Sequence, residues 1–157
     1  MGVLALRTRL VGVRTVLLDT MVFAYHLADH PEYSPLTAVV LGAVESGPLT
    51  GLATVVTLAE LLTQPARAGD RRAMQEYELF LTHFPHLQLA PMDVDLARET
   101  ALVRAETGLR TPDAIQVAAS RLHRADAIVT NDLRWRGRVV RPDLILLDDY
   151  LGRDADP

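Results

Sequence analysis

The stretch Thr15-Val16-Leu17-Leu18-Asp19-Thr20 predicts a short buried β-strand that ends on an acidic residue. Further apolar runs of strand length occur along the chain, at 49–53, 87–89, 127–130 and 144–147. Longer amphipathic stretches separate these runs, and this alternation is typical of βα units that build a parallel sheet. The expected fold class is therefore α/β with a central, mainly parallel sheet, rather than a sandwich or a bundle.

The amphipathic stretches predict where the helices lie. We expect helices at about 21–28, 35–45, 71–84, 93–106 and 112–124. Another helix should begin at Leu58 and end at Pro65, because proline has no backbone N–H to donate inside a helix. The domain is expected at residues 15–151, with a short tail at 152–157. Residues 1–14 are open between an added strand, an arm and a misassigned start.

Composition narrows the chemistry that this chain can perform. Its 157 residues suit a single domain. It contains no cysteine, which excludes disulfides, thiolate metal sites and cysteine nucleophiles. All 16 of its lysine-or-arginine positions are arginine, which excludes mechanisms that need a Schiff base or a phosphate-loop lysine. Any metal must be bound by oxygen or imidazole.

Charge and hydropathy say little about partners. The formal net charge of −4 argues weakly against a nucleic acid, because affinity for phosphate comes from basic surface. No apolar stretch approaches the roughly 20 residues that a membrane span requires. The first 14 residues lack the continuous apolar core of a secretory signal. We therefore expect a cytoplasmic protein with no membrane association.

Two acidic residues stand out in the first half of the chain. Asp19 directly follows the first strand, where an open α/β sheet has its binding crevice, and its alternative role is to cap the next helix. Glu60 lies in the apolar segment 55–62, where an unpaired carboxylate is costly to bury. Its alternative is a capping box, because Thr57 and Glu60 have the spacing of that motif.

Two more acids stand out in the second half. Asp113 follows Thr111 and Pro112, which are expected to be the N-cap and the first residue of a helix. A favourable interaction with the helix dipole is the alternative explanation for Asp113. Asp132 follows the strand expected at 127–130, and an ordinary turn or cap is its alternative.

Together the four acids favour a metal site. They fall at the ends of strands or the starts of helices, which a parallel sheet brings to one edge. Crowded carboxylates raise one another's pKa unless a cation neutralises them, so a bound divalent ion is the simplest compensation. Oxygen ligands without a soft donor predict Mg²⁺ or Mn²⁺. Whether one ion or two would bind stays open.

Four ordered blocks of the sequence resemble the PIN domain family, in particular the VapC-type toxins of bacterial toxin–antitoxin pairs. The similarity extends over about 16–150 and is carried by Val16–Thr20, Thr57–Leu62, Thr111–Ser120 and Ile128–Asp132. The resemblance implies a three-layer α/β/α domain that hydrolyses RNA phosphodiester bonds with Mg²⁺ or Mn²⁺. It also implies a cognate antitoxin that covers the acidic groove, and a homodimer is expected.

The resemblance also assigns roles to individual residues. The expected catalytic acids and metal ligands are Asp19, Glu60, Asp113 and Asp132, of which the last is a fourth member that can act through water. Thr20, Thr130 and Asn131 are expected to support them. Two positions depart from the family pattern, since Met21 replaces a common asparagine or serine and Trp135 a common phenylalanine. Neither departure removes an acid.

Arginines near the acids are the candidate RNA-binding residues. Their guanidinium groups can bind phosphates, and the alternative is a solvated basic loop. The residues concerned are Arg110, Arg134, Arg136, Arg138 and Arg141. Trp135 is open between stacking on a base and a core or dimer role. The pair His26 and His30 has helical spacing for zinc, but no third ligand completes a motif.

Three other functions compete with this interpretation. A phosphoacceptor receiver domain has a similar acidic pocket, but that family relies on a lysine, which this chain lacks. A non-catalytic PIN module that binds RNA or protein usually lacks some of the acids, and all four are present here. A flap-type DNA nuclease resembles PIN domains in fold and site but is larger, so RNA is the expected substrate.

Overall fold

The structure is a computed structural model that describes residues 2–152. Five strands carry the central sheet, and they are β1 Thr15–Leu18, β2 Thr50–Thr54, β3 Leu87–Ala90, β4 Ala127–Thr130 and β5 Asp143–Leu146. The helices are α1 Gly2–Leu10, α2 Thr20–Leu27, α3 Ser34–Glu45, α4 Val55–Arg67, α5 Arg71–His83, α6 Val94–Thr107 and α7 Thr111–Leu122. Two short 3₁₀ turns follow the last strands, η1 Leu133–Trp135 and η2 Leu147–Tyr150.

All the strand pairs are parallel, in the order β3-β2-β1-β4-β5, which confirms the predicted α/β class. The chain builds outward from β1 in one direction and then returns to add β4 on its other side. The strand order therefore reverses between β1 and β4, which pair with Leu18 opposite Val129. In open α/β sheets, this reversal opens a crevice at the carboxyl ends of the two strands.

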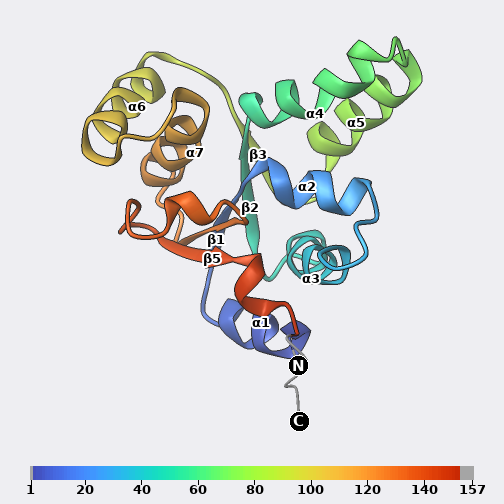
Figure 1. Cartoon of the computed structure of the whole chain (residues 1–157), viewed down its shortest axis with the longest axis horizontal. Coiled ribbons are helices and arrows are strands. Elements are labelled where there is room, and N and C mark those ends of the chain that lie inside the picture. Colours follow the sequence, from blue (N-terminus) through green and yellow to red (C-terminus); the bar gives the residue numbers. More distant parts are fainter. Residues whose placement is uncertain (1, 153–157) are drawn as a thin grey trace.

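Two apolar clusters cover the two faces of the sheet. Val16 and Leu18 contribute to one cluster, and Leu17 between them contributes to the other, because successive side chains of a strand point to opposite faces. The first cluster lies under α2, α3, α4 and α5, and the second under α6 and α7 (Figure 1). Burial on both faces explains why β1 and β4 are almost continuously apolar. The result is the three-layer α/β/α arrangement that was predicted.

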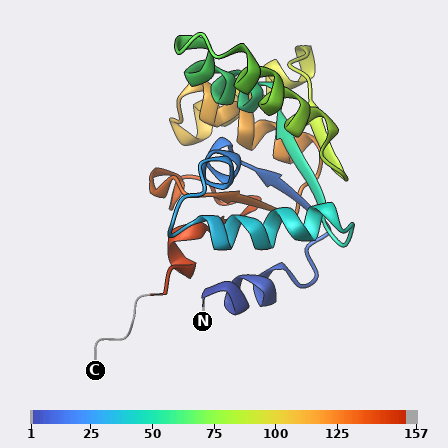
Figure 2. The same ribbon diagram turned by 90° about the vertical axis from the view of Figure 1, so that its right-hand side faces the viewer.

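The N-terminal segment is a helix, so the added strand considered for residues 1–14 is wrong for the described part of that segment. Helix α1 runs beside α3 and against η2 (Figure 2). Its Leu6 is fully buried, and its Arg9 forms an ion pair of 3.2 Å with Asp143 in β5. A Cβ on Gly2 would lie 1.7 Å from the Tyr150 carbonyl oxygen, so glycine is required at this close approach. Most of the tail at 152–157 lies outside the described residues.

Helix α4 differs from its prediction at both ends. It begins at Val55, three residues before the expected start, and Pro65 lies inside its last turn. The early start makes Thr54 the N-cap and places Thr57 at the third helical position. The hydroxyl of Thr57 bonds Thr20 and Gln116, so the capping box proposed for Thr57 and Glu60 is wrong. A similar shift makes Arg110, and not Thr111, the N-cap of α7.

Candidate metal centre at the carboxyl edge of the sheet

Asp19 is the most deeply buried of the four acids. It ends β1 and is the N-cap residue of α2, where its Oδ1 accepts the backbone N–H of Thr20 at 2.7 Å. Its Oδ2 accepts the hydroxyl of Thr130 at 2.6 Å. The pKa of Asp19 is nevertheless raised to about 6, mainly by burial and also by the negative charges of Glu60 and Asp113, which together outweigh those hydrogen bonds. A carboxylate at this position therefore lacks sufficient positive charge around it.

Asp132 lies beside Asp19 because β4 pairs with β1. The hydroxyl of Thr130 at the end of β4 accepts the backbone N–H of Asp132 at 3.1 Å while it donates to Asp19, so one side chain joins both acids. Asp132 caps η1 by accepting the Arg134 backbone N–H at 2.9 Å. The cap and turn that were considered as an alternative for Asp132 are therefore present, and they aim its carboxylate along the edge of the sheet.

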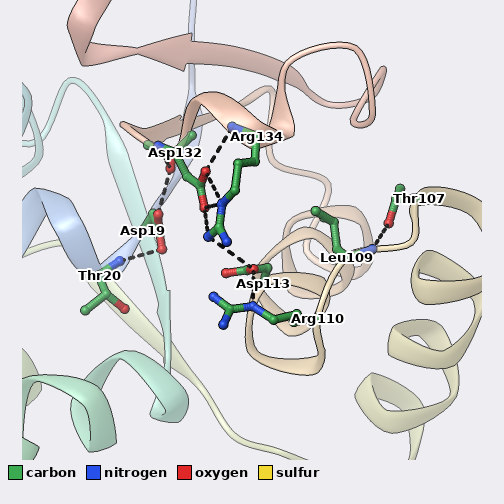
Figure 3. Close-up of polar contacts among 9 residues, drawn as sticks. Asp19, Thr20, Thr107, Leu109, Arg110, Asp113, Asp132 and Arg134 are labelled. Atoms are coloured by element: carbon green, nitrogen blue, oxygen red, sulfur yellow. Dashed lines mark hydrogen bonds and ion pairs between the residues drawn. The ribbon is translucent and has the colours of Figure 1, made fainter.

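Asp113 reaches the same edge from the first turn of α7. Gly108 in the left-handed conformation ends α6, and the Leu109 N–H donates to the Thr107 hydroxyl at 3.2 Å, which fixes the turn before α7. Figure 3 shows Asp113 and Asp132 on either side of the Arg134 guanidinium. Burial raises the pKa of Asp113 and the charge of Asp132 adds to this, while Arg110 and Arg134 oppose it. The two carboxylates are thus close enough to repel.

Glu60 differs from its prediction, because its side chain is exposed rather than buried in an apolar setting. It lies one turn after Thr57 on α4. The Thr57 hydroxyl is 3.1 Å from the Thr20 hydroxyl, so this turn of α4 packs against α2. Its negative charge adds to the effect of burial on the pKa of Asp19. No cap bond accounts for its position.

A buried polar network connects the elements that carry the acids, and the sequence analysis missed two of its members. Gln116 on α7 is 1% exposed, and its Nε2 donates to the Thr57 hydroxyl at 2.8 Å. Its Oε1 accepts the hydroxyl of Thr54 at the end of β2, at 3.2 Å. Polar groups this deeply buried require such partners. Gln116 follows Asp113 by one helical turn, and a glutamine in the otherwise apolar run 114–119 was the available signal.

The donor set fits a hard divalent cation, although the four acids are not closed around one. Across residues 2–152, no group of three or more histidine or acidic side chains is arranged to hold a metal ion. Three carboxylates nevertheless converge from β1, β4 and α7, and two of them have raised pKa values. Oxygen ligands of this kind suit Mg²⁺ or Mn²⁺. The closest positive charge to Asp113 and Asp132 is that of arginine.

The candidate RNA-binding arginines differ in the residues that they contact. Arg134 binds Asp132 through a two-pronged contact, and Arg110 lies 3.8 Å from Asp113. Arg136 pairs instead with Asp149 at 2.5 Å, away from the four acids. Arg138 and Arg141 are exposed beyond η1. In the described part of the chain, only Arg134 and Arg110 of this group contact any of the four acids.

Four further residues considered in the sequence lie outside the acidic site. The Asn131 side chain donates to the Tyr25 hydroxyl at 3.3 Å and accepts the Asp148 N–H at 2.8 Å, so it connects η2 to α2. Trp135 is 0% exposed in the core, which contradicts stacking on a base. Helix α2 ends at Leu27, between His26 and His30, so these histidines do not share a helical face.

Two hollows of the molecule lie away from the four acids. One of about 590 Å³ is lined by residues of α1 and α3, and one of about 1090 Å³ lies between α1 and η2. None of the four acids lines either of them.

The fold and this edge define a doubly wound α/β protein with an acidic site at the strand reversal. Residues 16–138 match the sequence model of the PIN domain, and this chain belongs to that family. The match runs from β1 to η1 and includes all four acids described above. No curated protein matches the chain. Helix α1 precedes the matched region, and no helix among residues 2–152 is long and apolar enough to cross a membrane.

Solved structures with the same fold include a toxin–antitoxin complex and VapBC complexes. The toxin–antitoxin complex from Klebsiella pneumoniae has a chain that is 20% identical, with a TM-score of 0.63 over 84% of this chain and 97% of that one. VapBC2 from Rickettsia felis, bound to a promoter DNA fragment, has a chain 18% identical with a TM-score of 0.64, over 84% and 98%. DNA-bound VapBC from Salmonella typhimurium gives 20% identity and 0.60, over 85% and 98%. At these identities the likeness shows the fold.

Proposed function

We propose that this protein is a divalent-metal-dependent endoribonuclease and the toxin of a type II toxin–antitoxin pair. PIN domains are typically nucleases, and the family match covers the whole acidic edge. The observation that carries the proposal is the convergence of Asp19, Asp113 and Asp132 beside the strand reversal, with the pKa values of the first two raised. Acids whose charge is destabilised by burial and, to a smaller extent, by neighbouring acids favour a site whose function requires a cation.

Each acid and arginine at this site would have a separate role. Asp19 would be a rigid ligand, because Thr20 and Thr130 hold both of its oxygens. Asp113 and Asp132 are half-buried and would complete the ligand set, and the exposed Glu60 would join from α4. A bound divalent ion supplies polarisation of a phosphoryl oxygen and a lowered pKa of water. Arg110 and Arg134 would hold substrate phosphates at the mouth of the site.

The partners follow from the same proposal. The similar structure from Klebsiella pneumoniae is described as a toxin–antitoxin complex, and the other two are described as VapBC. We infer that this chain also binds an antitoxin, whose segment over the acidic edge would block RNA. An antitoxin segment bearing arginine would complement the excess carboxylate charge there. The expected homodimer and cytoplasmic location stay predictions.

The test is cleavage of end-labelled single-stranded RNA by the purified protein, with DNA of the same sequence in parallel. Cleavage should require Mg²⁺ or Mn²⁺, act on RNA only, and leave 5′-phosphate and 3′-hydroxyl ends. Asp19→Asn should abolish it, whereas the matched change Asp95→Asn on the exposed face of α6 should not. Undiminished cleavage in excess chelator, or a cyclic 2′,3′-phosphate product, would contradict the metal mechanism. Preferential cleavage of DNA would favour the flap-type alternative.

A further inference from the structure

Arg134 makes an unusual set of contacts for an exposed side chain. Its backbone N–H and its Nε donate to Asp132 Oδ1 at 2.9 and 2.8 Å, and its Nε also reaches Oδ2 at 3.0 Å. Its Nη2 donates to the same Oδ2. Both oxygens of Asp132 are therefore occupied by one residue only two positions away.

The same guanidinium also faces the second acid of the site. Nη2 lies 3.9 Å from Asp113 Oδ2, so a single nitrogen stands between the carboxylates of Asp132 and Asp113 (Figure 3). A divalent cation that bound these two acids would need their oxygens within about 2.0–2.6 Å of itself. The position of the guanidinium and that of such an ion are therefore mutually exclusive.

The contact can be broken without unfolding the site. The Arg134 side chain is 60% exposed, whereas the Asp132 side chain is 17% exposed and the Asp113 side chain 21%. Rotation about the flexible arginine side chain moves the guanidinium into solvent while η1 and the cap of Asp132 stay in place. An ion pair with an exposed arginine is worth only about 0–1 kcal/mol. The binding free energy of a divalent cation readily exceeds this value.

We propose that Arg134 is an exchangeable internal counter-ion of the acidic site, bound to Asp132 and beside Asp113 without a divalent ion and displaced when the ion binds. This inference rests on the metal site proposed above. Displacement leaves the Arg134 guanidinium at the mouth of the site. There it can bind a substrate phosphate in place of the Asp132 carboxylate, since both groups accept its two-pronged hydrogen bonds. Metal binding and RNA binding would then be coupled through one side chain.

The first test is calorimetric titration of Mn²⁺ into the metal-free wild type, Arg134→Gln and Arg136→Gln. Both variants remove one positive charge from the same loop, but Arg136 pairs with Asp149 outside the acids. Arg134→Gln should bind Mn²⁺ about two- to fivefold more tightly, because the ion no longer competes with an ion pair. Arg136→Gln should bind like the wild type.

The outcomes separate the counter-ion role from the metal site itself. If the wild type binds Mn²⁺ and Arg134→Gln binds it with equal or lower affinity, Arg134 is no counter-ion and the metal site stands. Equal tightening in both variants would show a general charge effect and would also overturn the inference. If the wild type binds no Mn²⁺, the proposed metal site fails, and the counter-ion role fails with it.

A second measurement follows the guanidinium in the wild-type protein. The Nε–H nuclear magnetic resonance of Arg134, identified by its loss in Arg134→Gln, should be slow to exchange with water in the metal-free protein because it donates to both Asp132 oxygens. Saturation with Mg²⁺ should move it to the position and exchange rate of solvent-exposed arginines. A resonance unchanged at saturation would mean that Arg134 stays on Asp132 and would refute the exchange.

Discussion

Replacing Asp19 by asparagine should stabilise the metal-free protein at neutral pH, although Asp19 is the central acid of the site. Burial raises its pKa from 3.8 to about 6. Each pKa unit is worth about 1.36 kcal/mol, so the ionised side chain costs the fold about 3 kcal/mol at pH 7. The raised folded-state pKa means that the stability contributed by Asp19 is fully present below pH 3.8 and is lost as the pH rises through about 6.

The hydrogen bonds of Asp19 reduce the expected gain. The asparagine side chain would keep one acceptor for Thr20 N–H or the Thr130 hydroxyl, and its amide would require the other partner to turn. Losing one such bond costs about 1–2 kcal/mol. The net expectation for Asp19→Asn is therefore a gain of about 1–2 kcal/mol at pH 7, which raises the melting temperature by about 2–8 °C for a chain of this size.

Urea unfolding with chelator, at pH 7 and at pH 4.5, would measure this gain. The advantage of the variant should shrink at pH 4.5, because Asp19 is then protonated in the folded wild type. Asp126→Asn is the matched control of opposite sign, since the Arg14 and Thr15 N–H groups at 2.8 and 3.0 Å lower the pKa of Asp126. That variant should be less stable, most clearly at pH 7. A pH-independent loss of stability in Asp19→Asn would refute the reasoning.

Three other substitutions test separate parts of the structure. Glu60→Gln should change metal-free stability by less than about 0.5 kcal/mol, because the side chain is exposed and caps nothing, yet it should weaken Mn²⁺ binding in calorimetry. Thr57→Val should cost about 1–3 kcal/mol in urea unfolding, because it leaves Gln116 Nε2 buried without an acceptor; a silent change would show that this network contributes nothing to stability. Leu6→Ala should cost about 2–5 kcal/mol if α1 is part of the folded domain, and equal stability of the variant would make α1 a dispensable arm.

Much of the architecture follows from the sequence because its signals are local. The apolar run Val16–Leu18 is short, β-branched or aliphatic and followed by a turn into a helix, so strand identity and parallel pairing could be predicted. The end of α6 at Gly108 was predictable for the same reason, since only a local backbone conformation is involved. The start of α4 was not, because Thr57 has the spacing of a capping box with Glu60, whereas its hydroxyl bonds a glutamine that lies 59 positions away.

For the site, too, the sequence determined some features and the tertiary structure determined others. The sequence alone determined which acids end strands and begin helices, and therefore that Asp19, Asp113 and Asp132 meet at one edge. Only the tertiary structure decided that Glu60 is exposed, that Asn131 turns toward η2, and that Arg134 occupies the space between two carboxylates. The reason is physical: strand ends are set by backbone periodicity, whereas the partner that a charged side chain chooses depends on what the folded chain places within a few ångströms of it.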